Sequence, residues 1–171
     1  QFVIPSLRQQ VAPGGVYLGV APDQNFTYIA AVRPAIAFIV DIRRGNLLQH
    51  LFYKALFELS ADRASFVSRL FARARPPGLS SDASAVELFR AFAAQPPRDD
   101  IFRDTMQAVE AQLVDLRHLP LSPEDLAQIR QVASAFFAQG PDLRYTLVTG
   151  ASAGRVMTSF PTFGELACAT D

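Results

Sequence analysis

Side chains that bind metals or form crosslinks are scarce in this sequence. Cys168 is the only cysteine, so the chain can form neither an internal disulfide nor a zinc site built from several cysteines. His50 and His118 are the only histidines, which argues against a histidine-rich metal site. We therefore expect no metal centre. The single cysteine is compatible with a reducing compartment, and we expect a cytoplasmic location.

The chain also lacks an excess of charge of either sign. Sixteen basic and sixteen acidic residues give a formal net charge of zero. A protein that binds nucleic acid regardless of sequence needs a basic surplus to neutralise phosphates, so no nucleic-acid partner is indicated. Lys54 is the only lysine, and arginine supplies every other basic side chain. Arginine enrichment can favour anion recognition, but genomic base composition is the simpler explanation.

Long hydrophobic runs are absent as well. Half of the residues are hydrophobic, which is typical of a globular protein, but no apolar run reaches the roughly 18–20 residues that span a bilayer. We therefore expect no membrane span. Residues 1–10 lack the basic start and the apolar stretch of a signal peptide. Because the chain begins with Gln1 and not with Met, we expect a native N-terminus to be missing.

The clearest local pattern lies in the first quarter of the chain. Residues 16–20, Val-Tyr-Leu-Gly-Val, predict a short buried strand. Asp23 or Asn25 can cap a following helix over residues 26–32. Residues 35–42 predict a second strand, almost wholly apolar, which is typical of a parallel strand covered by helices on both faces. Together these segments predict a β-α-β unit with a right-handed crossover.

The remainder of the chain predicts mainly helices. Residues 46–140 read as a large helical insertion or lid, with helix starts at Ser84 and Ser122. A third strand is expected over Arg144–Thr149. The predicted fold is a single α/β domain over residues 1–171. It is a Rossmann-like three-layer α/β/α domain with a mainly parallel sheet and the insertion between strands two and three. Because three strands are few for such a sheet, we expect a truncated chain.

A ligand site is expected where the first two strands end. In doubly wound sheets, ligands bind at the carboxyl ends of the strands, and the turn at Gly19–Asn25 lies at such an end. The turn precedes a helix N-terminus, which suits an anionic group of a ligand. Asp41 follows about 20 positions after Gly19, where a carboxylate can accept both ribose hydroxyls. Arg43 and Arg44 could bind a carboxylate or phosphate. Equally, Asp23 or Asn25 could be only a cap, and Asp41 only a strand terminator.

Several stretches resemble a known family. Two stretches of the chain are similar to an uncharacterised family of bacterial proteins. The first is Gly15-x-Tyr17-Leu-Gly19-Val-x-Pro22-Asp-Gln-Asn25-Phe-Thr-Tyr-Ile, and the second, which follows it, is Ala37-Phe-Ile-Val-Asp41-Ile-Arg-Arg44. The stretches Tyr53–Glu58 and Phe160–Phe163 resemble it too. Members of this family look like S-adenosylmethionine-dependent methyltransferases in their core and continue past the point where this chain ends. The resemblance implies a Rossmann-like core.

The same resemblance implies S-adenosylmethionine as the cofactor. By this resemblance, the methyltransferase glycine loop falls on Gly19, Ala21 and Asp23. The acidic residue that commonly precedes this loop falls on Tyr17, and the ribose-binding acid falls on Asp41. Of these positions only Gly19 and Asp41 match the general methyltransferase pattern. The expected cofactor-binding residues are Gly19, Ala21, Asp23, Asn25, Asp41 and Arg43.

Two functions stay open at this point. One is a methyltransferase-like enzyme whose unidentified acceptor would bind in the helical block, because methyl transfer needs mainly alignment of the reactants. The other is a non-catalytic, Rossmann-like ligand-binding or scaffolding module, which the missing glycines favour. His50 is either a general base near the site or a boundary residue. The phenylalanines at helical spacing predict a hydrophobic core.

Overall fold

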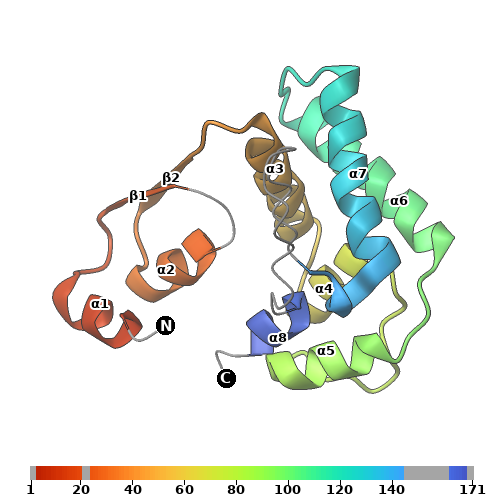
Figure 1. The fold of residues 1–171 in the computed structure, drawn as a ribbon, viewed down its shortest axis with the longest axis horizontal. Coiled ribbons are helices and arrows are strands. Elements are labelled where there is room, and N and C mark those ends of the chain that lie inside the picture. The colour runs from red at the N-terminus through yellow and green to blue at the C-terminus, as the bar shows by residue number, and fades with distance from the viewer. Residues whose placement is uncertain (1–2, 21–23, 145–161, 169–171) are drawn as a thin grey trace, which may run out of the picture. The chain divides into compact units, whose positions relative to one another are not determined.

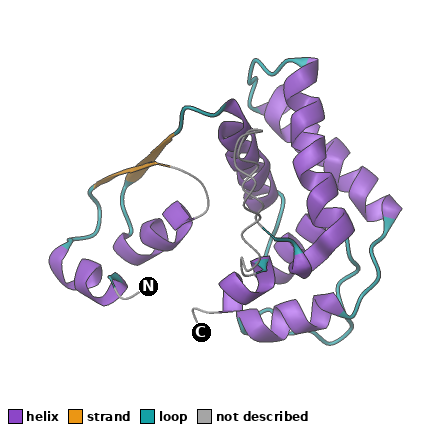
Figure 2. Cartoon of the chain, in the orientation of Figure 1, coloured by secondary structure: helices purple, strands orange, loops and turns teal. Residues whose placement is uncertain are grey.

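The computed structural model describes residues 3–20, 24–144 and 162–168, and the chain divides into two compact units. The first unit is Gln1–Leu51 and the second is Phe52–Asp171. Helices dominate both units, and the described residues contain one pair of strands, in the first unit (Figure 2). Helix α3 (Arg44–Glu58) contains the boundary between the units.

The structure describes four elements of the first unit before α3 begins. In chain order they are α1 (Ile4–Gln10), β1 (Val16–Val20), α2 (Gln24–Val32) and β2 (Ile36–Val40). The strands are parallel, with Val16 opposite Ile36 and Val20 opposite Val40. At the start of the pair, the Ala35 amide donates to the Gly15 carbonyl at 2.8 Å. The β-α-β unit predicted from the sequence is therefore confirmed.

In the described part of the first unit, helices cover one face of this sheet. Helices α1 and α2 lie on the same side of the β1–β2 pair (Figure 1). On the covered face Gly19 is buried, and Tyr17 and Ile39 are half-buried. The alternation of a strand places six large apolar side chains on the other face, each 48–74% exposed: Val16, Leu18, Val20, Ile36, Phe38 and Val40.

The predicted Rossmann-like fold class is wrong. A three-layer α/β/α domain needs helices on both faces of a larger, mainly parallel sheet, and the described residues hold a two-stranded sheet. The apolar run of β2 predicted cover on both faces, yet four of its five residues are exposed. An apolar pattern identifies the side chains that would gain from burial, but it carries no information on what covers them. The predicted third strand, apart from Arg144, lies outside the described residues.

The described part of the second unit is built from helices. After α3 come α4 (Arg63–Phe71), α5 (Ala85–Ala93), α6 (Asp99–Glu110), the π-helical turn η1 (Ala111–Leu116), α7 (Pro123–Gln139), the 3₁₀ turn η2 (Gly140–Asp142) and α8 (Phe163–Cys168). The predicted helix starts are confirmed. Ser84 forms a capping box with Glu87, and Ser122 forms one with Asp125.

Phenylalanine rings form much of the core of this second unit. Phe52, Phe71 and Phe92 are almost completely buried. The ring of Phe136 lies 6.4 Å from that of Phe52 and 6.2 Å from that of Phe71, measured between centroids. Such rings contribute both buried area and pairwise ring contacts to stability. The sequence prediction of a phenylalanine core is confirmed for this unit.

Two carboxylates in the second unit have strongly lowered pKa values. Glu58 accepts from Lys54 Nζ at 2.8 Å and from Gln112 Nε2 at 2.7 Å, and it pairs with Arg117. These partners, Lys54 first, lower the pKa of Glu58 from 4.5 to about 2. The hydroxyl and amide of Ser65 and the guanidinium of Arg75 lower the pKa of Asp62 from 3.8 to about 2.

We expect the protein to lose stability as the pH falls from about 4.5 to about 2. The pKa of Glu58 is lower in the folded state, so its stabilisation is complete above 4.5 and is lost as the pH approaches 2. In Glu58→Gln, the urea midpoint measured by circular dichroism should depend less on pH over this range than in the parent. Glu110→Gln, at an exposed position, is the control. Equal pH slopes in Glu58→Gln and the parent would contradict the expectation.

Candidate functional site

Asp41 lies where the sequence places it, at the carboxyl end of the parallel pair. It follows Val40, which is opposite Val20, the last residue of β1. Its Oδ1 accepts from the Arg43 amide at 2.8 Å, and its Oδ2 accepts from Asn46 Nδ2 at 2.6 Å. These two hydrogen bonds, the amide of Arg43 first, lower the pKa of Asp41. Both carboxylate oxygens therefore hold the turn that leads into α3.

Gly19 and Asn25 lie together on the covered face of the sheet. Asn25 is 3% exposed, its Oδ1 accepts from the Tyr17 hydroxyl at 2.8 Å, and its Nδ2 donates to the Val20 carbonyl at 3.2 Å. A Cβ added to Gly19 would overlap Asn25 Oδ1 and lie 2.7 Å from Tyr17 Cε1. The missing side chain at Gly19 thus makes room for the Asn25 amide, which ties the start of α2 to the end of β1.

The expected cofactor residues form two local groups. Gly19 lies with Asn25, and Asp41 is hydrogen-bonded to the backbone of Arg43. Ala21 and Asp23 lie outside the described residues. His50, on α3, is half-buried, and its ring meets Phe26 of α2 edge-on with centroids 5.4 Å apart. The contacts of Gly19 and Asn25 hold the β-α-β unit together, and those of Asp41 hold the turn into α3.

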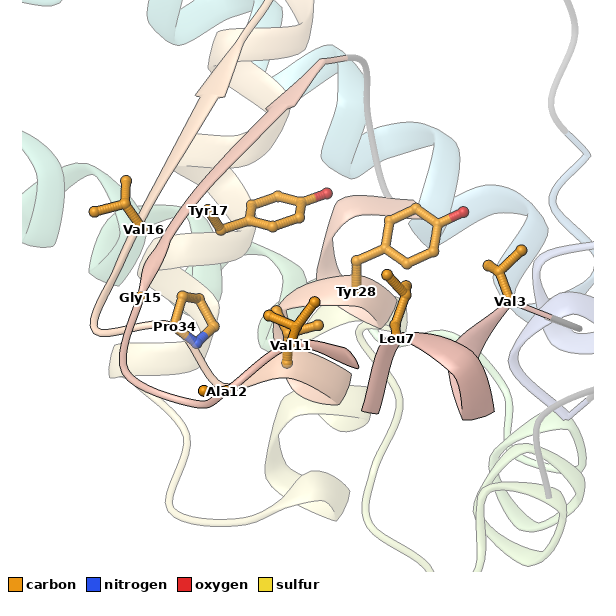
Figure 3. Close-up of a pocket in the computed structure, with 10 residues that line it drawn as sticks. Val3, Leu7, Val11, Ala12, Gly15, Val16, Tyr17, Tyr28 and Pro34 are labelled. Carbon is orange, nitrogen blue, oxygen red and sulfur yellow. The ribbon is translucent and has the colours of Figure 1, made fainter. Parts of the chain in front are cut away.

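A hollow of about 390 Å³ lies at the other end of the strands (Figure 3). We call it the α1–α2 hollow, and its lining comprises Val3, Leu7, Val11, Ala12, Gly15, Val16, Tyr17, Tyr28, Val32 and Pro34. Gly15 and Val16 stand at the beginning of β1, whereas Asp41 follows the end of β2. The hollow is therefore separated from the predicted ligand position by the length of the strands.

Two tyrosines supply the polar side-chain groups of the α1–α2 hollow. The rings of Tyr17 and Tyr28 lie beside each other, with their hydroxyls pointing in a similar direction (Figure 3). The Tyr17 hydroxyl donates to Asn25, and the Tyr28 hydroxyl accepts from Gln24 Nε2 at 2.7 Å. Burial first, and then the neighbouring Tyr28, raise the pKa of Tyr17 above its ordinary value. Like any tyrosine, it is neutral at neutral pH. The lining therefore suits an uncharged, mainly apolar molecule.

Sequence reasoning missed this hollow. Its lining comes from separate segments that meet only in the folded unit. One signal was present, because Val3, Leu7 and Val11 recur every four residues and so share one face of a helix. That stripe indicates an apolar face on α1, but it does not distinguish a packed face from a face that lines a hollow.

In the part of the chain that the structure describes, no group of three or more metal-binding side chains gathers at one place. Among the same residues no helix is both long enough and apolar enough to cross a bilayer.

Comparison with known proteins places the chain in a family without assigning it an activity. A family model described as a domain of unknown function (DUF7790) matches residues 3–114 of the 171. The match includes the β-α-β unit and the helices as far as η1. No curated protein and no solved structure matches the chain. Because the matched segment exceeds half of the chain, this protein belongs to the DUF7790 family of domains of unknown function.

Proposed function

We propose that the protein is a non-catalytic module that binds a small, uncharged, mainly apolar molecule in the α1–α2 hollow. The supporting observation is the hollow itself, whose volume of about 390 Å³ falls in the range of about 300–1,000 Å³ that small-molecule sites occupy. Such sites combine apolar walls with a few polar groups that orient the ligand. Tyr17 and Tyr28 supply those groups here.

A methyltransferase-like activity with S-adenosylmethionine is the second candidate. The carboxylate of Asp41 at the carboxyl end of β2 favours it, because a ribose could bind at that position. Against it, a ribose would compete with Arg43 and Asn46 for the carboxylate oxygens, and the Asn25 amide fills the space beside Gly19. This activity stays a prediction, as does a cytoplasmic location.

A fluorinated phenol tests the hollow. We expect 4-fluorophenol to bind the parent protein with a dissociation constant of about 1 mM, measured from its fluorine NMR signal. Leu7→Phe adds volume inside the hollow and should weaken binding at least about tenfold. Leu116→Phe makes the same change on the surface of the second unit, where Leu116 is 66% exposed, and should leave binding unchanged.

Two results would overturn this proposal. One is a parent protein that gives no saturable signal, and the other is equal binding by Leu7→Phe and Leu116→Phe, provided that circular dichroism shows both variants folded.

Calorimetric titration with S-adenosylmethionine tests the second candidate in the same preparations. Micromolar binding that Asp41→Ala abolishes would favour the methyltransferase-like activity, and no heat of binding would remove it.

A further inference from the structure

We infer that the face of the β1–β2 sheet opposite α1 and α2 is an interface with a second copy of this chain. We call this surface the open sheet face, and it consists of Val16, Leu18, Val20, Ile36, Phe38 and Val40. The parallel register places Leu18 beside Phe38 and Val20 beside Val40, so the six side chains form one continuous patch. Each of them is about half exposed or more.

An apolar patch of this kind is unusual on a monomeric protein. Parallel sheets are normally covered on both faces, because their crossover connections place helices there. Here α1 and α2 lie on one side of the pair (Figure 1). The open sheet face presents six side chains without a charge among them. Large exposed apolar patches mark interaction sites. The absence of charged side chains from the patch favours an equally apolar partner surface.

The area of the open sheet face fits a second copy. Large side chains bury on the order of 150–200 Å² each when they are fully covered, so the exposed fractions of the six correspond to roughly 600 Å². Two copies face to face would then bury about 1,200 Å² in total, which is the lower end of the range for specific interfaces. We therefore expect a dimer that dissociates at micromolar concentrations.

The open sheet face is also chemically compatible with a symmetric, two-fold dimer. In a symmetric dimer each copy presents the same surface to the other, so the surface has to complement itself. A patch with like charges would repel its own copy, whereas an uncharged apolar patch meets no such repulsion. Stacked sheets pack about 10 Å apart, a distance that allows side chains such as Leu18 and Phe38 to interdigitate across the interface.

Sedimentation velocity of the full chain, from about 5 to about 500 µM, tests the inference. We expect a reversible dimer with a dissociation constant of about 10–100 µM in the parent protein. Leu18→Lys should raise that constant more than tenfold, because each copy would bury an unpaired ammonium group. Leu116→Lys is the matched control, since Leu116 and Leu18 are 66% and 72% exposed, and it should dimerise like the parent.

Phe38→Lys repeats the test from the other strand, so the result does not depend on one variant remaining folded. Val16 belongs to both the open sheet face and the lining of the α1–α2 hollow. Neither Leu18 nor Phe38 lines the hollow, so ligand binding there is a separate measurement for these two variants. A parent protein that stays monomeric at 500 µM would overturn the inference. Another part of the same chain would then be the better candidate to cover the open sheet face. A dimer that persists in folded Leu18→Lys or Phe38→Lys would overturn it too, because the contact would lie elsewhere.

Discussion

Replacing Gly19 by alanine is expected to lower the free energy of unfolding by about 2–4 kcal/mol. Gly19 is buried in β1, and the added Cβ would overlap Asn25 Oδ1 and lie 2.7 Å from Tyr17 Cε1. Relieving the overlap moves the Asn25 amide, and that movement breaks its hydrogen bonds to Tyr17 and Val20. The cost therefore combines overpacking with the loss of buried hydrogen bonds, and urea unfolding followed by circular dichroism measures it.

Gly15→Ala is the matched control for this prediction. Gly15 precedes the same strand, and a Cβ built there meets no atom within 4 Å, so we expect a change within about 0.5 kcal/mol. A second variant identifies the cause. In the Asn25→Ala background, Gly19→Ala should cost less than it does alone, because the overlapping atom is gone. Equal costs of Gly19→Ala in the two backgrounds would show that Asn25 is not what requires glycine at position 19.

The local part of the fold was predictable because its signals are local. The strand at residues 16–20, the helix after it and the second strand all follow from short patterns, and the structure places the strands in parallel. The capping boxes at Ser84 and Ser122 are equally local, because each needs only a residue three positions further on. The number of layers depends on contacts between distant segments of the chain. The apolar run of β2 led to the wrong prediction of a third layer, because such a run does not say which segments cover it.

The candidate site shows a different limit of sequence reasoning. A glycine after a strand permits close approach by a ligand or by another side chain of the same protein, and the residue type is the same in both cases. At Gly19 the approaching group is the amide of Asn25. A carboxylate can likewise accept from a ribose or from nearby amides, and Asp41 accepts from Arg43 and Asn46. Only coordinates separate these alternatives.

Replacing Phe71 by alanine is expected to have the largest effect on the second unit, about 3–5 kcal/mol of unfolding free energy. The side chain of Phe71 has no exposed surface. Ring centroids of Phe89, Phe136 and Phe163 lie 5.8, 6.2 and 6.1 Å from its own, so α5, α7 and α8 all contact it. Alanine would leave a cavity among these rings, and the helices can close such a cavity only in part.

Phe57→Ala makes the same change where burial is incomplete. Phe57 is 52% exposed and stacks on Phe66 with centroids 4.8 Å apart, so we expect a cost of about 0.5–1.5 kcal/mol. Phe71→Leu keeps most of the buried volume and should fall between the two alanine variants. Urea unfolding of the three variants ranks them. If Phe71→Ala costs no more than Phe57→Ala, the ring cluster around Phe71 cannot be what holds α5, α7 and α8 together.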